Sequence, residues 1–218
     1  MMKRGTENEG PKLATPAEFS VQAYFQTLTR IIPQLPYAAI QQIISAIMQA
    51  FEESRTIFVF GNGGSAATAS HMMCDLNKGA LAHGEARRLK VISFTDNVPL
   101  LTAWANDAGY EHVFSEQLKN FVQPGDVVFA ISGSGNSPSI IEALKTARDA
   151  GAVTVGMAGY AGGKMKALCD ICAVVPCDDI RVVEDLHHAI AHSVLTAVRA
   201  KLAVYPQKTA AAASGPAK

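Results

Sequence analysis

The chain has no net charge, no long apolar run and few cysteines. Its 19 lysine and arginine residues equal its 19 aspartate and glutamate residues, so no net charge favours nucleic acid or an anionic membrane as a partner. No apolar run approaches the ~18 residues that a membrane span needs, and residues 1–19 lack the apolar stretch of a secretory signal. We therefore expect a cytoplasmic protein that binds neither nucleic acid nor a membrane.

Cysteine occurs at four positions, which is too few for a disulfide scaffold. Cys169 and Cys172 have the C-x-x-C spacing of redox and zinc motifs, but the sequence offers no second pair and no helix start there. The segment 169–175 instead indicates a helix end that runs into a buried strand. We expect these cysteines to be small apolar residues of the core.

Five short apolar runs dominate the chain after residue 55. They cover residues 56–60, 89–93, 126–131, 153–157 and 171–175, and stretches with helical spacing separate them. Runs that are apolar on both faces are typical of parallel strands covered by helices on each side. The pattern predicts an α/β fold, a three-layer αβα sandwich with a five-stranded parallel sheet.

Two amphipathic helices are expected before the sheet and one long helix after it. Apolar residues recur at helical spacing over 21–32 and 40–51, and again from about residue 182 to residue 203. The ends, residues 1–14 and 206–218, are polar or rich in small residues, so we expect disordered tails around a single domain of residues 15–205.

Two loops rich in glycine and serine follow the first and third expected strands. They read Gly61-Asn-Gly-Gly-Ser65, before a helical stretch over 66–77, and Ser132-Gly-Ser-Gly-Asn-Ser137, before a helix near Pro138. Glycines allow close backbone approach, and the free N–H groups of a new helix bind anions. Either loop alone is explained as an ordinary turn. Neither has the Walker or dinucleotide pattern, so together they favour a sugar monophosphate over a nucleotide.

Histidines and carboxylates concentrate in two helical segments. His71 and Asp75 are four apart and share one helix face. The last helix carries Glu184, His187, His188 and His192. Such groups suit a divalent metal and equally suit general acid–base chemistry, whereas a surface ion pair and a packed helix face are the simpler alternatives.

These motifs resemble those of the sugar isomerase (SIS) domain family, and within it the phosphoheptose isomerases. The resemblance covers roughly Phe19 to Ala203. It rests on both loops, on a His-x-x-x-acid pattern after the first, on the Asn-Asp-x-Gly-Tyr segment 106–110, on the Gly-Gly-Lys-Met segment 162–165, and on the histidines of the last helix. It implies an aldose–ketose isomerase that converts sedoheptulose 7-phosphate to D-glycero-D-manno-heptose 7-phosphate through an enediol(ate).

The resemblance also implies a site. Substrate phosphate would be held by Ser132, Gly133, Ser134 and Ser137, and the rest of the substrate by Asn62, Gly63, Gly64, Ser65, Asn106, Asp107 and Glu184. One Zn²⁺ or other divalent ion per subunit would be bound by His71, Asp75, Glu184 and His192. Asp75 would be the base and His192 the acid. Relatives are homotetramers, which implies active sites at subunit interfaces.

Two departures from the family pattern concern this site. Asp75 stands where glutamate is usual, and Glu184 stands where glutamine is usual. On a continuous helix, Glu184 and His192 are about 12 Å apart along the axis, so either Glu184 lies in a loop that folds back or another subunit supplies a ligand. A non-catalytic SIS protein, which binds a phosphosugar or associates with a replication initiator, remains the alternative function.

Overall fold

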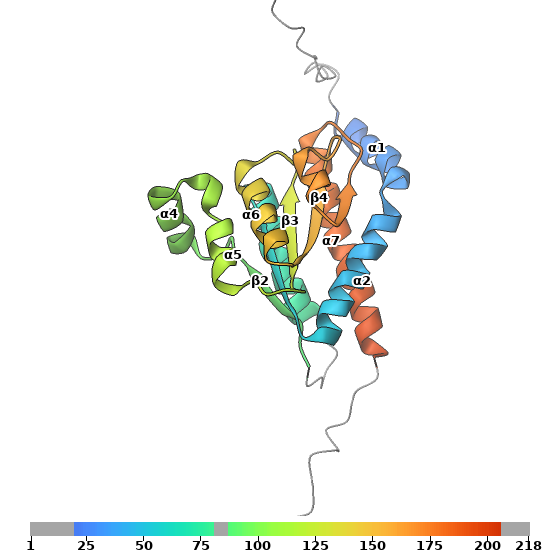
Figure 1. Cartoon of the computed structure of the whole chain (residues 1–218). Coiled ribbons are helices and arrows are strands. Elements are labelled where there is room, and N and C mark those ends of the chain that lie inside the picture. Colours follow the sequence, from blue (N-terminus) through green and yellow to red (C-terminus); the bar gives the residue numbers. More distant parts are fainter. Residues whose placement is uncertain (1–19, 81–86, 206–218) are drawn as a thin grey trace, which may run out of the picture.

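The computed structural model describes residues 20–80 and 87–205 and is built on one parallel sheet (Figure 1). The strand order is β2-β1-β3-β4-β5, and every neighbouring pair is parallel. The strands are β1 (Thr56–Gly61), β2 (Lys90–Ser93), β3 (Val127–Ser132), β4 (Val153–Ala158) and β5 (Ile171–Val174). The predicted α/β fold with a five-stranded parallel sheet is confirmed. The two expected tails lie outside the described residues, so the domain boundaries remain a prediction.

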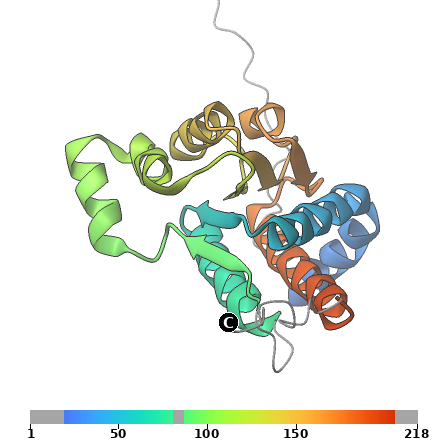
Figure 2. The same cartoon turned by 60° about the horizontal axis from the view of Figure 1, so that its bottom comes forward.

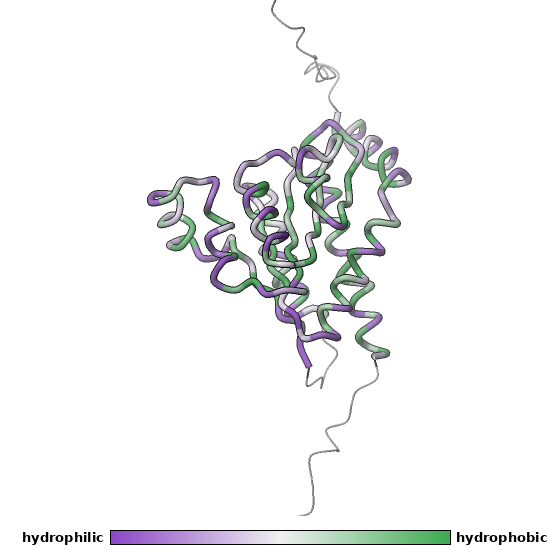
Figure 3. Tube along the Cα trace, viewed as in Figure 1, coloured by the Kyte–Doolittle hydropathy of each residue, from purple (hydrophilic) through white to green (hydrophobic). Residues whose placement is uncertain are grey.

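Alternate residues of each central strand point to opposite faces of the sheet. Ile57 and Val59 of β1 pack into one apolar cluster, whereas Phe58 and Phe60 pack into another. All four are essentially inaccessible to solvent, as expected for a parallel sheet that is covered on both sides. Figure 3 accordingly shows hydrophobic residues along the central strands.

Helices cover the two faces unequally. One face carries α2 (Tyr37–Glu53), α3 (Gly64–Cys74) and α7 (Ile180–Ala203), with α1 (Val21–Ile31) outside them. The other face carries α5 (Ser115–Phe121) and α6 (Pro138–Asp149). The layers are seen from below in Figure 2. Helix α4 (Val98–Asp107) has no buried residue and stands away from the body in both views.

Four short helical turns complete the described chain: η1 (Ile32–Gln34), η2 (Asp75–Gly79), η3 (Tyr110–His112) and η4 (Lys164–Ala167). The helix expected over 66–77 begins earlier, at Gly64, and changes at Asp75 into a turn of π-helix. Such wide turns are frequent at functional sites. The last helix begins at Ile180 rather than at 182, because the Asp179 side chain caps it by accepting from the backbone N–H of Arg181.

Helix α1 is joined to α7 by one polar contact. The Tyr24 hydroxyl donates to Oδ2 of Asp185 at 2.5 Å. Burial and this hydrogen bond raise the pKa of Tyr24 to about 12. The opposite side of α1 leaves Val21 and Phe25 largely exposed.

Within the described residues, no single helix is long and apolar enough to cross a membrane. The segments Val21–Gln34 and Tyr37–Glu53 are together long and apolar enough for a membrane span, by length and composition alone. They are bent by 72° at their junction. Seven residues of α2 are buried in the core of this chain.

Candidate functional site

The two glycine- and serine-rich loops meet at the carboxyl end of the sheet, where β1 and β3 are neighbours. Asn62 connects them, because its Nδ2 donates to the Ser139 hydroxyl of α6 at 2.9 Å. Oδ1 of Asn62 accepts from the Tyr110 hydroxyl at 2.9 Å. The first loop is therefore fixed to the segment after the second loop and to the end of the Asn-Asp-x-Gly-Tyr segment.

The second loop folds on its own hydroxyl groups. Oγ of Ser132 accepts from the Gly135 N–H at 3.2 Å, and Oγ of Ser134 accepts from the Asn136 N–H at 3.2 Å. Ser137 stands at the N-cap of α6 without a side-chain bond to that helix. Pro138 has no N–H, and the N–H groups of Ile140 and Ile141 donate to the Ser137 carbonyl. The Ser137 hydroxyl and the Ser139 N–H are therefore the donors at this helix start that suit an anion.

A glycine turn before η4 closes against the second loop. Gly135 has φ +65°, and a methyl group there would lie 2.2 Å from the carbonyl oxygen of Gly162. The Lys164 N–H donates to Oδ1 of Asn136 at 3.0 Å. This backbone contact places Lys164 next to the serine loop, a neighbour that the sequence did not indicate although the Gly-Gly-Lys-Met segment was part of the resemblance.

Two imidazoles and a carboxylate gather where α3 meets α7. His71 Nε2 lies 3.4 Å from Oδ2 of Asp75, as their helical spacing predicts. His192 Nε2 lies 3.6 Å from the same oxygen and 3.2 Å from Nε2 of His71. The three side chains are partly exposed, with Asp75 the least so at 21%. Asp75 reaches both histidines although its side chain is one methylene shorter than glutamate.

The separations between these donors fit a zinc-sized ion. Tetrahedral bonds of about 2.05 Å place neighbouring ligand atoms about 3.3 Å apart. The observed separations of 3.2, 3.4 and 3.6 Å bracket that value. Imidazole nitrogen and carboxylate oxygen are also the donors that zinc accepts, so His71, Asp75 and His192 fit such an ion in distance and chemistry.

Glu184 does not join this cluster within the chain. It lies inside the continuous helix α7, so the expectation that it folds back from a preceding loop is wrong. Its carboxylate packs on the first loop, where a methyl group at Gly64 would lie 2.7 Å from Oε1. Within the chain His71, Asp75 and His192 come together, whereas Glu184 lies two turns before His192 on α7. The place of Glu184 in the predicted metal set stays a prediction, which now needs a ligand from another subunit.

The last helix places its other two histidines on different sides. His187 is buried, and neither ring nitrogen has a hydrogen-bond partner among the described residues. Burial lowers the pKa of His187, and the nearby backbone of Ala158 opposes this shift. His188 faces the cluster, with its ring centroid 4.6 Å from those of His71 and His192. Burial, followed by the charges of His71 and His192, lowers the pKa of His188. His188 and His192 are four residues apart on a helix, so the sequence alone could have predicted that His188 lies on the same helix face as His192.

The remaining predicted residues lie in different places. Ser65 is buried in the first turn of α3, after the exposed Gly63 and Gly64. Asn106 and Asp107 end the outlying helix α4, where Nδ2 of Asn106 donates to Oδ1 of Asp107 at 2.7 Å. Among the residues that the structure describes, no hydrogen bond joins this pair to the loops. Tyr110, three residues further on, makes that connection through its hydroxyl.

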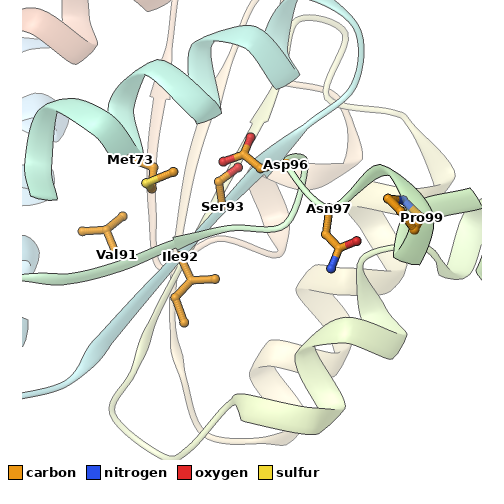
Figure 4. Close-up of a pocket in the computed structure, with 7 residues that line it drawn as sticks. All are labelled: Met73, Val91, Ile92, Ser93, Asp96, Asn97 and Pro99. Carbon is orange, nitrogen blue, oxygen red and sulfur yellow. The ribbon is translucent and has the colours of Figure 1, made fainter.

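A pocket of about 520 Å³ opens at the edge of the sheet beside β2 (Figure 4). It is lined by Met73, Val91, Ile92, Ser93, Asp96, Asn97 and Pro99. Its walls are largely apolar, and they carry a carboxylate and no cationic side chain, which is unfavourable for a phosphate.

Comparison with known proteins points to the same chemistry. The profile of the SIS domain family matches residues 23–159. A phosphoheptose isomerase of Helicobacter hepaticus is 37% identical over 180 residues, which are 83% of this chain and 90% of the relative. One of Pelobacter propionicus is 37% identical over 183 residues, which are 84% of this chain and 94% of the relative.

The fold of a solved relative agrees as well. The structure of phosphoheptose isomerase GmhA from Neisseria gonorrhoeae superposes with a TM-score of 0.77 at 28% identity, and the match covers 83% of this chain and 97% of that one. With the two loops and the His–Asp cluster in place, the chain belongs to the SIS domain family and, within it, to the phosphoheptose isomerases.

Proposed function

We propose that this phosphosugar isomerase converts sedoheptulose 7-phosphate to D-glycero-D-manno-heptose 7-phosphate. The observation that carries the proposal is the His71–Asp75–His192 cluster, with separations of 3.2 to 3.6 Å, where the helix that follows the first loop meets α7. The relatives named phosphoheptose isomerase supply the substrate class. A non-catalytic role is not favoured, because both Asp75 and His192 are kept and lie within reach of one another.

The serine loop would bind the substrate phosphate. Ser134 is exposed and Ser137 is unbonded to its helix, so both hydroxyl groups are available as donors. The N-terminus of α6 adds the Ser139 N–H and the positive end of its dipole. Lys164, held beside the loop by Asn136, adds a positive charge. The sugar chain would then extend towards the cluster between α3 and α7.

Isomerisation needs a proton moved between adjacent carbons and a second proton moved between their oxygens. Asp75 would take the proton from the carbon next to the carbonyl and return it to the neighbouring carbon. His192 would donate to the carbonyl oxygen, and the hydroxyl on the adjacent carbon would give up a proton in turn, so no atom is lost or gained. The enediol(ate) formed between the two steps is stabilised by positive and hydrogen-bonding groups.

A divalent ion, Zn²⁺ for preference and one per subunit, would be held by His71, Asp75 and His192. When bound, such an ion supplies Lewis-acid polarisation of a substrate oxygen. The proposed location is the cytoplasm, which suits a protein whose cysteines are free.

The test is a turnover assay with sedoheptulose 7-phosphate, with and without added Zn²⁺. Replacing Ser134 and Ser137 together by alanine is expected to raise KM by roughly 10- to 100-fold with little change in kcat, because hydrogen bonds to a charged group contribute about 1.5–3 kcal/mol. Sedoheptulose without its phosphate serves as the matched substrate, and its turnover is expected to be insensitive to the double variant. Absence of turnover with every C5 to C7 sugar phosphate would contradict the proposal.

We further propose a homotetramer with active sites at its interfaces. Val21 and Phe25 are 70% and 60% exposed on α1, and Val98 is 61% exposed on α4, so both helices offer apolar side chains that another subunit can cover. Light scattering is expected to give about four times the chain mass of 23.1 kDa, and Phe25→Lys to lower that mass and the activity together. Full activity at the mass of one chain would contradict this assembly.

A further inference from the structure

We infer that Cys169 and Cys172 form a reversible thiol–disulfide pair, and that closing the disulfide loosens the serine loop, residues 132–137. The thiol chemistry goes beyond the proposed function and is independent of it. Only the effect on turnover rests on that function.

The two sulfur atoms meet over one residue of β4. A methyl group at Gly156 would lie 2.7 Å from Sγ of Cys169 and 3.3 Å from Sγ of Cys172. Both sulfur atoms therefore occupy the space that a side chain would fill here, and a glycine inside a strand is typical of such a close approach. The cysteines pack at the edge of an apolar cluster, yet both remain partly exposed, so a small oxidant can reach them.

The turn between the two cysteines is held in place by Asp170. Oδ2 of Asp170 accepts from the backbone N–H and from the hydroxyl of Thr154, both at 2.8 Å. The Asp170 N–H donates to the Thr154 carbonyl at 2.9 Å. Because these bonds fix the turn against β4, little further ordering is needed to bring the sulfur atoms together.

The two thiols differ in acidity. The Cys169 thiol, as a hydrogen-bond donor, lowers the pKa of Cys172; burial opposes this shift, and the positive charge of Lys166 adds to it. The same hydrogen bond, followed by burial, raises the pKa of Cys169. Since the thiolate is the nucleophile, Cys172 is the attacking cysteine and Cys169 the resolving one.

The oxidant would be a low-molecular-weight disulfide such as oxidised glutathione. The Cys172 sulfur attacks one of its sulfur atoms, the first thiol leaves with the proton of Cys172, and a mixed disulfide remains. The Cys169 thiol then gives up its proton and attacks the Cys172 sulfur, which releases the second thiol. Two cysteine thiols are thereby oxidised, and one disulfide is reduced to two thiols.

The turn η4 joins this pair to the serine loop. The Cys169 N–H donates to the Met165 carbonyl at 3.0 Å, and the Met165 N–H donates to the Gly135 carbonyl at 3.0 Å. Cys172 is held in the ladder between β4 and β5, whereas Cys169 lies outside any strand or helix. An S–S bond of about 2.05 Å therefore draws Cys169 towards β5 and strains the contact between η4 and Gly135.

The first test follows the thiols of the full chain. The reduced protein is incubated with oxidised and reduced glutathione at set ratios, alkylated and mapped by mass spectrometry. An internal disulfide is expected to remove two of the four thiols and to be reversed by dithiothreitol. Cys169→Ser is expected to stop at a glutathione adduct on Cys172, and Cys172→Ser to form neither product. Cys177→Ser, the matched control in the same segment, is expected to form the disulfide as the wild type does.

The second test measures the serine loop by hydrogen exchange, without substrate. Peptides that span residues 132–137 and 162–168 are expected to exchange ~2- to 10-fold faster after oxidation, the change that loss of one hydrogen bond produces. Cys172→Ser treated in the same way is expected to show no change. The KM for sedoheptulose 7-phosphate is expected to rise by a similar factor in the oxidised wild type.

Two results would overturn the inference. One is the absence of a disulfide between Cys169 and Cys172 at every glutathione ratio, and the other is a disulfide that leaves the exchange of both peptides unchanged. Absence of turnover with any sugar phosphate would contradict the proposed function alone, because neither the thiol map nor the exchange rates depend on catalysis.

Discussion

Asp75→Asn is expected to lower kcat for sedoheptulose 7-phosphate by ~10²- to 10⁴-fold, the usual contribution of a general base. Asparagine keeps the shape of the side chain but cannot accept a proton from a carbon acid. Because the substrate phosphate would be held by the serine loop, KM is expected to change much less than kcat. Initial rates over a range of substrate concentrations separate the two constants.

Two further variants sharpen this experiment. Asp75→Glu restores a carboxylate and is expected to keep more turnover than Asp75→Asn. Asp149→Asn, at the far end of α6 from the serine loop, is the control for removing one carboxylate and is expected to behave as wild type. Solvent deuterium is expected to enter the substrate carbon in the wild type and not in Asp75→Asn. Turnover that survives in Asp75→Asn would show that another group is the base.

Gly135→Ala is expected to destabilise the fold and to abolish tight binding of the phosphosugar. Its positive φ of +65° costs an L-residue ~1–2 kcal/mol, and forcing a side chain into a packed site costs a further ~1–3 kcal/mol. The second cost arises because the new methyl group would lie 2.2 Å from the Gly162 carbonyl oxygen, which is backbone and cannot swing away. Urea unfolding and a thermal shift with sugar phosphate measure the two effects.

Gly151→Ala is the matched control for this substitution. Gly151 also has a positive φ, +73°, but a methyl group there would meet Pro124 at an ordinary 3.5 Å. It is expected to lose only the ~1–2 kcal/mol of the left-handed backbone and to retain phosphosugar binding. Equal losses of unfolding free energy in the two variants would mean that the close contact between the serine loop and the Gly162 turn adds nothing to the cost of the Gly135→Ala substitution.

The local pattern of the sequence was sufficient to predict the strands of the sheet and the positions of the two loops. Each of the five apolar runs forms a strand within one or two residues of its predicted position. The central strands β1 and β3 are buried on both faces and are therefore almost continuously apolar, whereas the edge strand β2 alternates exposed and buried residues. His71 and Asp75 lie within 3.4 Å for an equally local reason, since four residues on a helix make little more than one turn.

Tertiary structure decided which side chains share the site. The π turn at Asp75 and the packing of α3 against α7 bring His192 to within 3.6 Å of Asp75, across more than a hundred residues of chain. Glu184 and His188 lie on that same helix α7, and both were candidates by residue type. In the structure His188 packs against His71 and His192, whereas the carboxylate of Glu184 packs at Gly64. The sequence does not show this difference, because it does not show where a neighbouring helix begins. Periodicity determines the face of a helix on which a residue lies, whereas the packing of distant segments determines what that face meets.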